Sequence, residues 1–164
     1  MSDNDSDAVR EKYGSFIDQH LATYLDSGGT EGHIMDMSHT GVNALLPTLL
    51  LKTRGRRTGR ELIVPLIYGC YGQEWVVIAS RGGMPQHPAW YLNLREQKET
   101  AFQVATQCFR ATWREAAGEE QDRVWAYMAH LFPPYRDYRR ATAGQRDIPV
   151  IMLRPTAAQP VFKR

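Results

Sequence analysis

The chain is 164 residues long, with 43% hydrophobic and 23% charged residues and a formal net charge of +2 at pH 7. This length suits one domain with a sizeable core, and this composition excludes a disordered chain or a coiled coil. The apolar runs are too short to span a bilayer, and the acidic N-terminus is not a signal peptide. Cys70 and Cys108 lack CxxC spacing, which indicates reduced thiols in a cytoplasmic protein.

The N-terminal segment predicts an acidic tail followed by an amphipathic helix. Residues 1–7 are expected to be disordered, with Asp7 as the helix cap. Apolar residues recur at helical spacing from Asp7 to about Leu25, and Ser27-Gly28-Gly29 would end the helix. Residues 1–30 are net acidic, which favours packing on protein over binding to anionic lipid. We therefore divide the chain into 1–30, a tail and helix, and 31–164, the main domain, with peripheral contact at a membrane left open.

A polar, irregular loop is expected over residues 32–42, followed by short strands. Pro65 indicates an edge position or a bulge in the second of them. A helix is expected over 118–132, ended by Pro133-Pro134, and the tail beyond Pro155 is expected to be frayed. This order favours a mainly β, small antiparallel barrel with peripheral helices over a doubly wound parallel sheet. The expected strands are 47–53, 61–69, 73–80, 100–106, 109–116 and 148–153.

A basic, glycine-punctuated loop joins the first two of these strands. Five of the nine residues from Lys52 to Arg60 are cationic, so the rest of the chain carries a negative net charge. Guanidinium groups bind phosphate or carboxylate through paired hydrogen bonds. Taken alone, such a loop is more often simply solvated.

A second turn, from Ser80 to Pro88, offers the other half of an anion site. Arg81 supplies charge, and Gly82-Gly83 allow a ligand to approach the backbone closely. Pro88 suits the first turn of a helix whose free N–H groups face the same region. The simpler alternative is that the glycines only turn the chain. Loop and turn together indicate an anionic ligand.

Other kinds of site find little support. The histidines lack metal-ligand spacing, and no GxSxG, Walker or GxGxxG motif occurs. Nucleic acid is not expected as a partner, because the basic loop is small and no aromatic residues interleave with it. Tyr135 and Tyr138, three residues apart, would share one face of a helical turn. Packing residues with a solvated hydroxyl are the alternative for both.

Four stretches of the sequence carry a resemblance: LLLKTRGRRTGRELIVPLIY, VVIASRGGMPQHPAWYLNL, FPPYRDYRRAT and RDIPVIMLRP. They resemble the deazaflavin-dependent nitroreductase and quinone reductase family of actinobacteria, over roughly Thr48 to Pro155. The resemblance implies a split β-barrel that binds coenzyme F-420, an 8-hydroxy-5-deazaflavin with a phosphate and an oligoglutamate tail. The reduced cofactor would pass a hydride to a quinone, an enone or a nitro-type acceptor.

The resemblance also implies roles for individual residues. Tyr135 and Tyr138 would face the substrate, and Ser80 would place a third hydroxyl near the ring. Arg56, Arg57 and Arg81 would hold the phosphate and tail, and no metal is expected. The full expected set of cofactor contacts is Lys52, Arg54, Arg56, Arg57, Thr58, Gly59, Arg60, Pro65, Ala79, Ser80, Arg81, Gly82, Gly83, Trp90 and Tyr91.

Two positions depart from the family's pattern. Members often have a basic residue where this chain has Leu62, and nitroreductase members tend to have a tyrosine where it has Phe132. The second departure favours a quinone or enone reductase over the reduction of nitroimidazoles. An FMN-binding split-barrel oxidoreductase and a non-catalytic cofactor-binding protein are the alternatives. The expected partner is a small-molecule electron acceptor, without stable membrane insertion, and exposed barrel edges would suit a homodimer.

Overall fold

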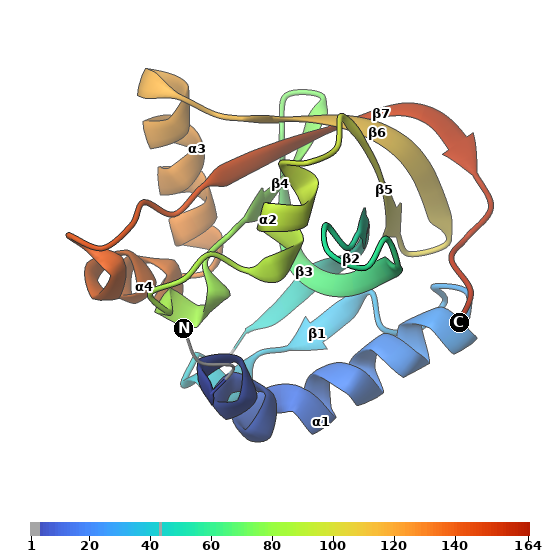
Figure 1. The fold of residues 1–164 in the computed structure, drawn as a ribbon, viewed down its shortest axis with the longest axis horizontal. Helices are drawn as coiled ribbons and strands as arrows, with labels where there is room; N and C mark the ends of the chain where they lie inside the picture. The colour runs from blue at the N-terminus through green and yellow to red at the C-terminus, as the bar shows by residue number, and fades with distance from the viewer. Residues whose placement is uncertain (1–3, 43) are drawn as a thin grey trace.

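The computed structural model describes residues 4–42 and 44–164, with side chains from residue 14 onwards. Within these ranges a β-barrel is surrounded by α-helices (Figure 1). The strands are β1 (Ile34–Asp36), β2 (Leu45–Arg54), β3 (Glu61–Tyr71), β4 (Glu74–Ile78), β5 (Glu99–Val104), β6 (Gln107–Glu115) and β7 (Val150–Gln159). The helices are α1 (Asn4–Asp26), α2 (Ala89–Leu94), α3 (Gly118–Leu131) and α4 (Pro134–Thr142), with 3-10 turns η1 (Ser38–Thr40) and η2 (Arg81–Gly83).

The barrel is closed by the pairing of β2 with β5. The sheet order is β1-β2-β3-β4-β7-β6-β5, and β2 also pairs with β5. β1 pairs with the first residues of β2, and β5 pairs with β2 from Leu49 to Lys52, so both occupy the same edge. All pairs are antiparallel. The predicted antiparallel barrel with peripheral helices is confirmed, and the fold is a split β-barrel.

Successive side chains of β2 belong alternately to two apolar clusters, one inside the barrel and one outside it. Leu49 and Leu51 pack inside the barrel with Phe102, whereas Leu50 faces outward toward α1. Successive side chains of a strand point to opposite faces, so one apolar run can serve both clusters. All three leucines are fully buried, which explains why β2 reads as a continuous apolar strand.

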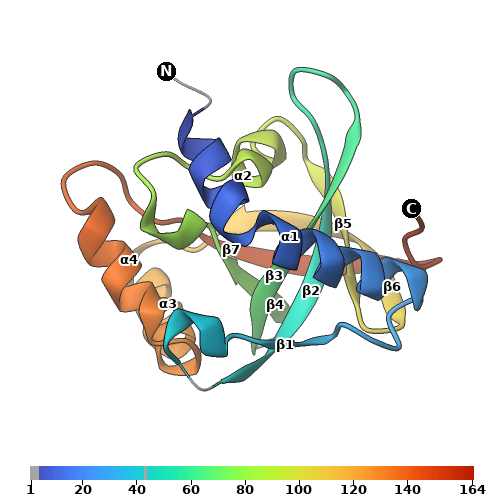
Figure 2. The same cartoon turned by 90° about the horizontal axis from the view of Figure 1, so that it is seen from below.

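Helix α1 lies across the outside of the barrel (Figure 2). Its anchor is Tyr24, which is 0% exposed. The Tyr24 hydroxyl donates to the Thr48 carbonyl at 2.9 Å and accepts the Ala105 N–H at 2.8 Å. The expected packing of this helix on protein is confirmed for its C-terminal half, whereas Phe16 remains half-exposed. Among the described residues, no helix is both long and apolar enough to cross a membrane.

Two expectations for the N-terminal part were wrong. The backbone is helical from Asn4, so Asp7 lies within α1 rather than capping it. Residues 1–3 of the expected tail lie outside the described residues. Strand β1 forms inside the expected loop, because the long strand β2 leaves backbone groups at its start that Ile34–Asp36 can pair with.

The C-terminal tail is also ordered, contrary to expectation. β7 continues to Gln159, which pairs with Cys108 of β6, and Phe162 is 3% exposed. The Phe162 amide donates to the Gln103 side chain at 2.8 Å. Pairing with β6 therefore orders a polar segment that has no strand pattern of its own. Both cysteines are free thiols, Cys108 buried and Cys70 exposed.

Pro65 sits where the sequence placed it, at an edge. It is in register with Leu50 of β2, and residues 61–67 of β3 pair with β2. The pairing of β3 with β4 begins only at Tyr68. The other side of β3 is therefore open beside Pro65, where a missing N–H costs no ladder hydrogen bond.

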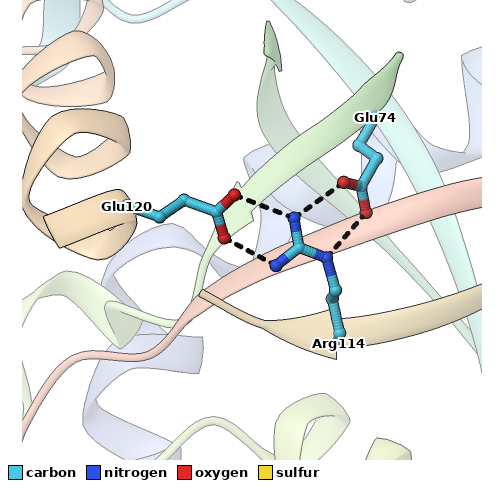
Figure 3. Close-up of polar contacts among 3 residues, drawn as sticks. All are labelled: Glu74, Arg114 and Glu120. Carbon is cyan, nitrogen blue, oxygen red and sulfur yellow. Dashed lines mark hydrogen bonds and ion pairs between the residues drawn. The ribbon is translucent and has the colours of Figure 1, made fainter. Parts of the chain in front are cut away.

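An ion-pair network joins α3 to the barrel (Figure 3). The Arg114 guanidinium on β6 donates to both carboxylate oxygens of Glu74, at 2.8 and 3.1 Å, and of Glu120, at 2.6 and 3.1 Å. These bonds raise the pKa of Arg114 and lower the pKa of Glu120. The network therefore fixes the start of α3 against β4 and β6.

Candidate functional site

The chain leaves β4 at Ile78 and enters a turn with left-handed backbone. We use "the Ser80 turn" for residues 80–87. Arg81, Gly82 and Gly83 have φ values of 45°, 60° and 80°. The Gly83 N–H donates to the Ser80 carbonyl at 2.9 Å. Glycine adopts such values freely, whereas a positive φ is uncommon for arginine and is maintained only where neighbours enforce it.

Helix α4 packs directly on this turn. A Cβ atom added to Gly83 would lie 3.0 Å from the Tyr138 Cα and 3.4 Å from the Ala141 Cβ. Glycine is therefore needed at position 83 for two reasons, its φ and the close approach of α4. This contact brings the half-buried Tyr138 beside the Ser80 turn.

The two candidate tyrosines have different surroundings. Tyr135 is 4% exposed, and its ring packs on Trp125 and Phe132 at 6.2 and 5.1 Å between centroids. Burial raises the pKa of Tyr135. Tyr138 is half-buried, with its ring 6.2 Å from that of Tyr135. The geometry therefore gives Tyr138 the better access to a ligand.

Helix α2 forms the wall next to the turn. It begins at Ala89, directly after Pro88, and is six residues long. Trp90 and Tyr91 are buried, and the Tyr91 hydroxyl donates to the Glu115 carboxylate. Burial together with Glu115 raises the pKa of Tyr91 to about 12. These rings are packed walls, and the Tyr91 hydroxyl is already engaged.

The basic loop docks on the same helix through Asn93, which the sequence analysis missed. The Asn93 side-chain oxygen accepts both the backbone N–H and a guanidinium N–H of Arg56, each at 3.1 Å. Asn93 is 2% exposed and donates to Thr53 at 3.4 Å. A single asparagine after WYL carries no local signal for this contact. The loop and the Ser80 turn thus approach α2 together.

The tip of the basic loop is exposed. Its hydrogen bonds are internal: the Arg60 N–H donates to the Thr58 hydroxyl at 3.2 Å, and the Gly59 N–H to the Gly55 carbonyl at 2.8 Å. The side chain of Arg57 is exposed as well. The guanidinium groups of Arg57 and Arg60 make no ion pair with the described side chains.

Lys52 and Arg54 lie on the opposite face of β2. Thr53 between them points to Asn93, so its two neighbours point away from α2. Lys52 pairs with Glu61 at 3.1 Å and lies over the ring of Phe162. Both cations line a groove of about 350 Å³ beside β5 and β6. The structure therefore separates Lys52 and Arg54 from the Ser80 turn, although the sequence grouped them with it.

Arg146 is a second residue that the sequence analysis missed. It lies after α4, and its guanidinium donates to the carbonyls of Ala79, Ser80 and Met84 at 3.2, 2.8 and 3.0 Å. Burial, and then the charge of Arg81, lower the pKa of Arg146. Neither arginine makes an ion pair with a described carboxylate, so two positive charges meet at the turn.

His87 ends the turn in contact with several charges. Its Nδ1 lies 3.3 Å from Arg146, and its ring packs on Tyr91 at 4.8 Å. A guanidinium only donates, so Nδ1 must be the acceptor and unprotonated. Burial, Arg146 and Arg95 lower the pKa of His87, and the smaller effects of Glu115 and Asp147 raise it. The folded protein therefore resists protonation of this histidine.

This predicts acid sensitivity below the ordinary histidine pKa of about 6.5. As the pH falls through that value, the unfolded chain takes up a proton at residue 87 that the folded chain refuses. The free energy of unfolding should then decrease until the pH reaches the lower, folded pKa. Urea unfolding between pH 5 and 8 should show a shallower pH dependence for His87→Gln than for wild type. Identical pH dependence in the two proteins would contradict this reading of His87.

Comparison with known proteins gives a consistent set of relatives. The profile of the family described as F420H(2)-dependent quinone reductase matches residues 17–155. An F420H(2)-dependent quinone reductase of Mycobacterium tuberculosis is 29% identical over 137 residues, which cover 82% of this chain and 86% of the relative. A solved structure of an F420-H2 dependent reductase (FDR-A) has 32% identity and a TM-score of 0.59 over 65% of this chain and 93% of that chain. A domain-swapped dimer has 29% identity and a TM-score of 0.62 over 85% and 98% of the two chains.

Proposed function

The chain belongs to the F420H(2)-dependent quinone reductase family of oxidoreductases, and from this premise we propose that it binds the cofactor's anionic part between the Ser80 turn and the basic loop. The observation that carries the proposal is the turn itself. It combines left-handed backbone, the positive charges of Arg81 and Arg146, which make no ion pair with a described carboxylate, and the adjacent residue Tyr138.

The residues present fit an F-420 phosphate and glutamate tail. Among the described residues, the Arg81 guanidinium has only one weak hydrogen bond, a 3.5 Å approach to the His87 carbonyl. Arg57 and Arg60 are likewise not neutralised by described side chains. Several cations kept without partners are costly for the folded protein, because they repel one another, and an anionic ligand removes that cost. Lys52 and Arg54 are not part of this proposed binding site.

The chain's own part in the reaction is positioning and proton supply. Reduced F-420, when bound, supplies the hydride that the acceptor takes up. Negative charge then develops on the acceptor oxygen, and the Tyr138 hydroxyl stabilises it and donates a proton. Ser80 offers a second hydroxyl at the end of β4, and the buried rings of Trp90 and Tyr91 keep one side of the site dry.

A quinone or enone is the acceptor class we favour. The position at which nitroreductase members tend to carry tyrosine is Phe132 here, 1% exposed and packed edge-on against Tyr135. A buried ring at this place offers no hydroxyl to a nitro group. We therefore propose that nitroimidazoles are poor substrates.

Anaerobic turnover with a soluble naphthoquinone tests this function. The purified protein should oxidise reduced F-420 in the presence of the quinone much faster than it oxidises reduced FMN, and much faster than it reduces a nitroimidazole. Turnover with reduced FMN but not with reduced F-420 would contradict the proposal. No quinone-dependent oxidation of either cofactor would favour a cofactor-binding protein without this activity.

A second copy of the chain is the partner we propose for the free edge of β1. Ile34 is 53% exposed and Leu45, in the adjoining strand, is 70% exposed. An unpaired edge with apolar side chains favours self-association. The relative that forms a domain-swapped dimer supports the idea by likeness.

A further inference from the structure

Arg146 links the two sides of the Ser80 turn to α4. Its own backbone N–H is fixed to the Thr142 carbonyl at 3.1 Å, at the end of α4. Its guanidinium reaches the start of the turn through Ala79 and Ser80, and the far side through Met84 and His87. These partners lie about sixty residues earlier in the chain, so the contact is purely tertiary. One side chain thus holds both ends of the turn.

The direction of these hydrogen bonds decides where the turn's amides point. In a planar trans peptide the carbonyl of one residue and the N–H of the next point in opposite directions. The carbonyls of Ala79 and Ser80 face Arg146, so the N–H groups of Ser80 and Arg81 face away from it. In the described part of the chain, neither of these amides donates to a backbone carbonyl. The turn therefore presents open donors on the side opposite Arg146.

This conformation needs external support. Three consecutive residues from Arg81 to Gly83 have positive φ, and one of them is not glycine. Such backbone persists only where surrounding contacts over-determine it. Charge-assisted hydrogen bonds from a planar guanidinium are strong and directional enough to do so, and the flexible ammonium of lysine cannot reproduce their geometry.

We propose that Arg146 is a positioning residue for the cofactor site. It holds the Ser80 turn so that the amides of Ser80 and Arg81, together with the Arg81 guanidinium, receive the anionic group of the cofactor. Arg146 itself stays on the far side, bonded to the carbonyls. The inference rests on the proposed function and adds to it the residue that shapes the binding turn before any ligand arrives.

Three variants distinguish a positioning role of Arg146 from direct contact with the cofactor and from a general effect on stability. Arg146→Lys keeps the charge but loses the planar guanidinium, and Arg81→Gln loses the proposed contact. Arg114→Lys disrupts an equally well-bonded guanidinium whose partners, Glu74 and Glu120, lie outside the turn. Each is compared with wild type by hydrogen exchange of residues 79–88 in the cofactor-free protein, by F-420 fluorescence titration, and by thermal unfolding.

The expected pattern differs for each variant. Arg146→Lys should speed amide exchange across the turn and raise the F-420 dissociation constant roughly tenfold or more, as loss of charged hydrogen bonds implies. Arg81→Gln should raise the dissociation constant without changing the exchange. Arg114→Lys should lower only the unfolding temperature. Should Arg146→Lys not fold, Gly83→Ala, which displaces the turn from the α4 side, must weaken binding in its place.

Two results would overturn the inference while the proposed function stands. One is wild-type F-420 affinity in Arg146→Lys, and the other is reduced affinity with unchanged exchange of the turn, which would make Arg146 a direct contact. Absence of F-420 binding to wild type would instead contradict the proposed function and, with it, this role.

Discussion

Replacing Arg81 with glutamine is expected to weaken F-420 binding by roughly ten- to a hundredfold, because a charged hydrogen bond contributes about 1.5–3 kcal/mol. Arg81 is the second residue of the Ser80 turn, and among the described residues its guanidinium has only the weak contact with the His87 carbonyl. The wild-type dissociation constant should also rise with salt, since exposed charge pairs are screened. Fluorescence titration of both proteins at two ionic strengths measures each effect.

An exposed arginine on α3 provides the control. Arg123 pairs with Glu119 one helical turn away and lies on the solvent side of the helix. Arg123→Gln should bind F-420 as wild type does, at either salt concentration. If Arg81→Gln and Arg57→Gln both retain wild-type affinity, neither the Ser80 turn nor the basic loop is the anion site.

Replacing Tyr138 with phenylalanine is expected to lower kcat for quinone reduction by about 10²-fold or more, the usual contribution of a positioned proton donor. The change removes the hydroxyl and keeps the ring that packs near Tyr135. Affinity for F-420 should change little, because in the proposed arrangement the lost hydroxyl serves the acceptor and not the phosphate. Steady-state kinetics and cofactor titration together separate these effects.

Tyr135→Phe is the matched comparison. Its ring belongs to the core and is 4% exposed, so kcat should stay close to wild type. A large loss of kcat in Tyr135→Phe but not in Tyr138→Phe would make Tyr135 the proton donor and Tyr138 a packing residue. Wild-type turnover in both variants would make the tyrosines walls of the pocket, with water as the proton source.

The barrel was predictable because its strands carry local patterns. Alternation in β5 and β6 and the apolar run of β2 specify strands whatever lies beside them. β1 and the second half of β7 have no such pattern; they are ordered by pairing with β2 and β6. Sequence patterns report what a segment prefers alone, and these two segments depend on a neighbour.

The two loops of the candidate site were predictable from the sequence, but the residues that hold these loops in place were not. Glycines and clustered arginines identify the Ser80 turn and the basic loop from residue type alone. Asn93 and Arg146 act on backbone groups far away in sequence, and nothing near them indicates those partners. Lys52 and Arg54 belong to the end of β2, where successive side chains point to opposite faces, so both point away from the Ser80 turn. The number of cations in the segment does not show this separation.

The most direct test of the account is a titration of the wild-type protein with oxidised F-420, and separately with FMN, at low salt. Binding to the Ser80 turn predicts saturable F-420 fluorescence quenching that is weakened by salt and by Arg81→Gln, together with much weaker FMN binding. Equal or tighter binding of FMN, or F-420 binding that responds to neither salt nor Arg81→Gln, would contradict it.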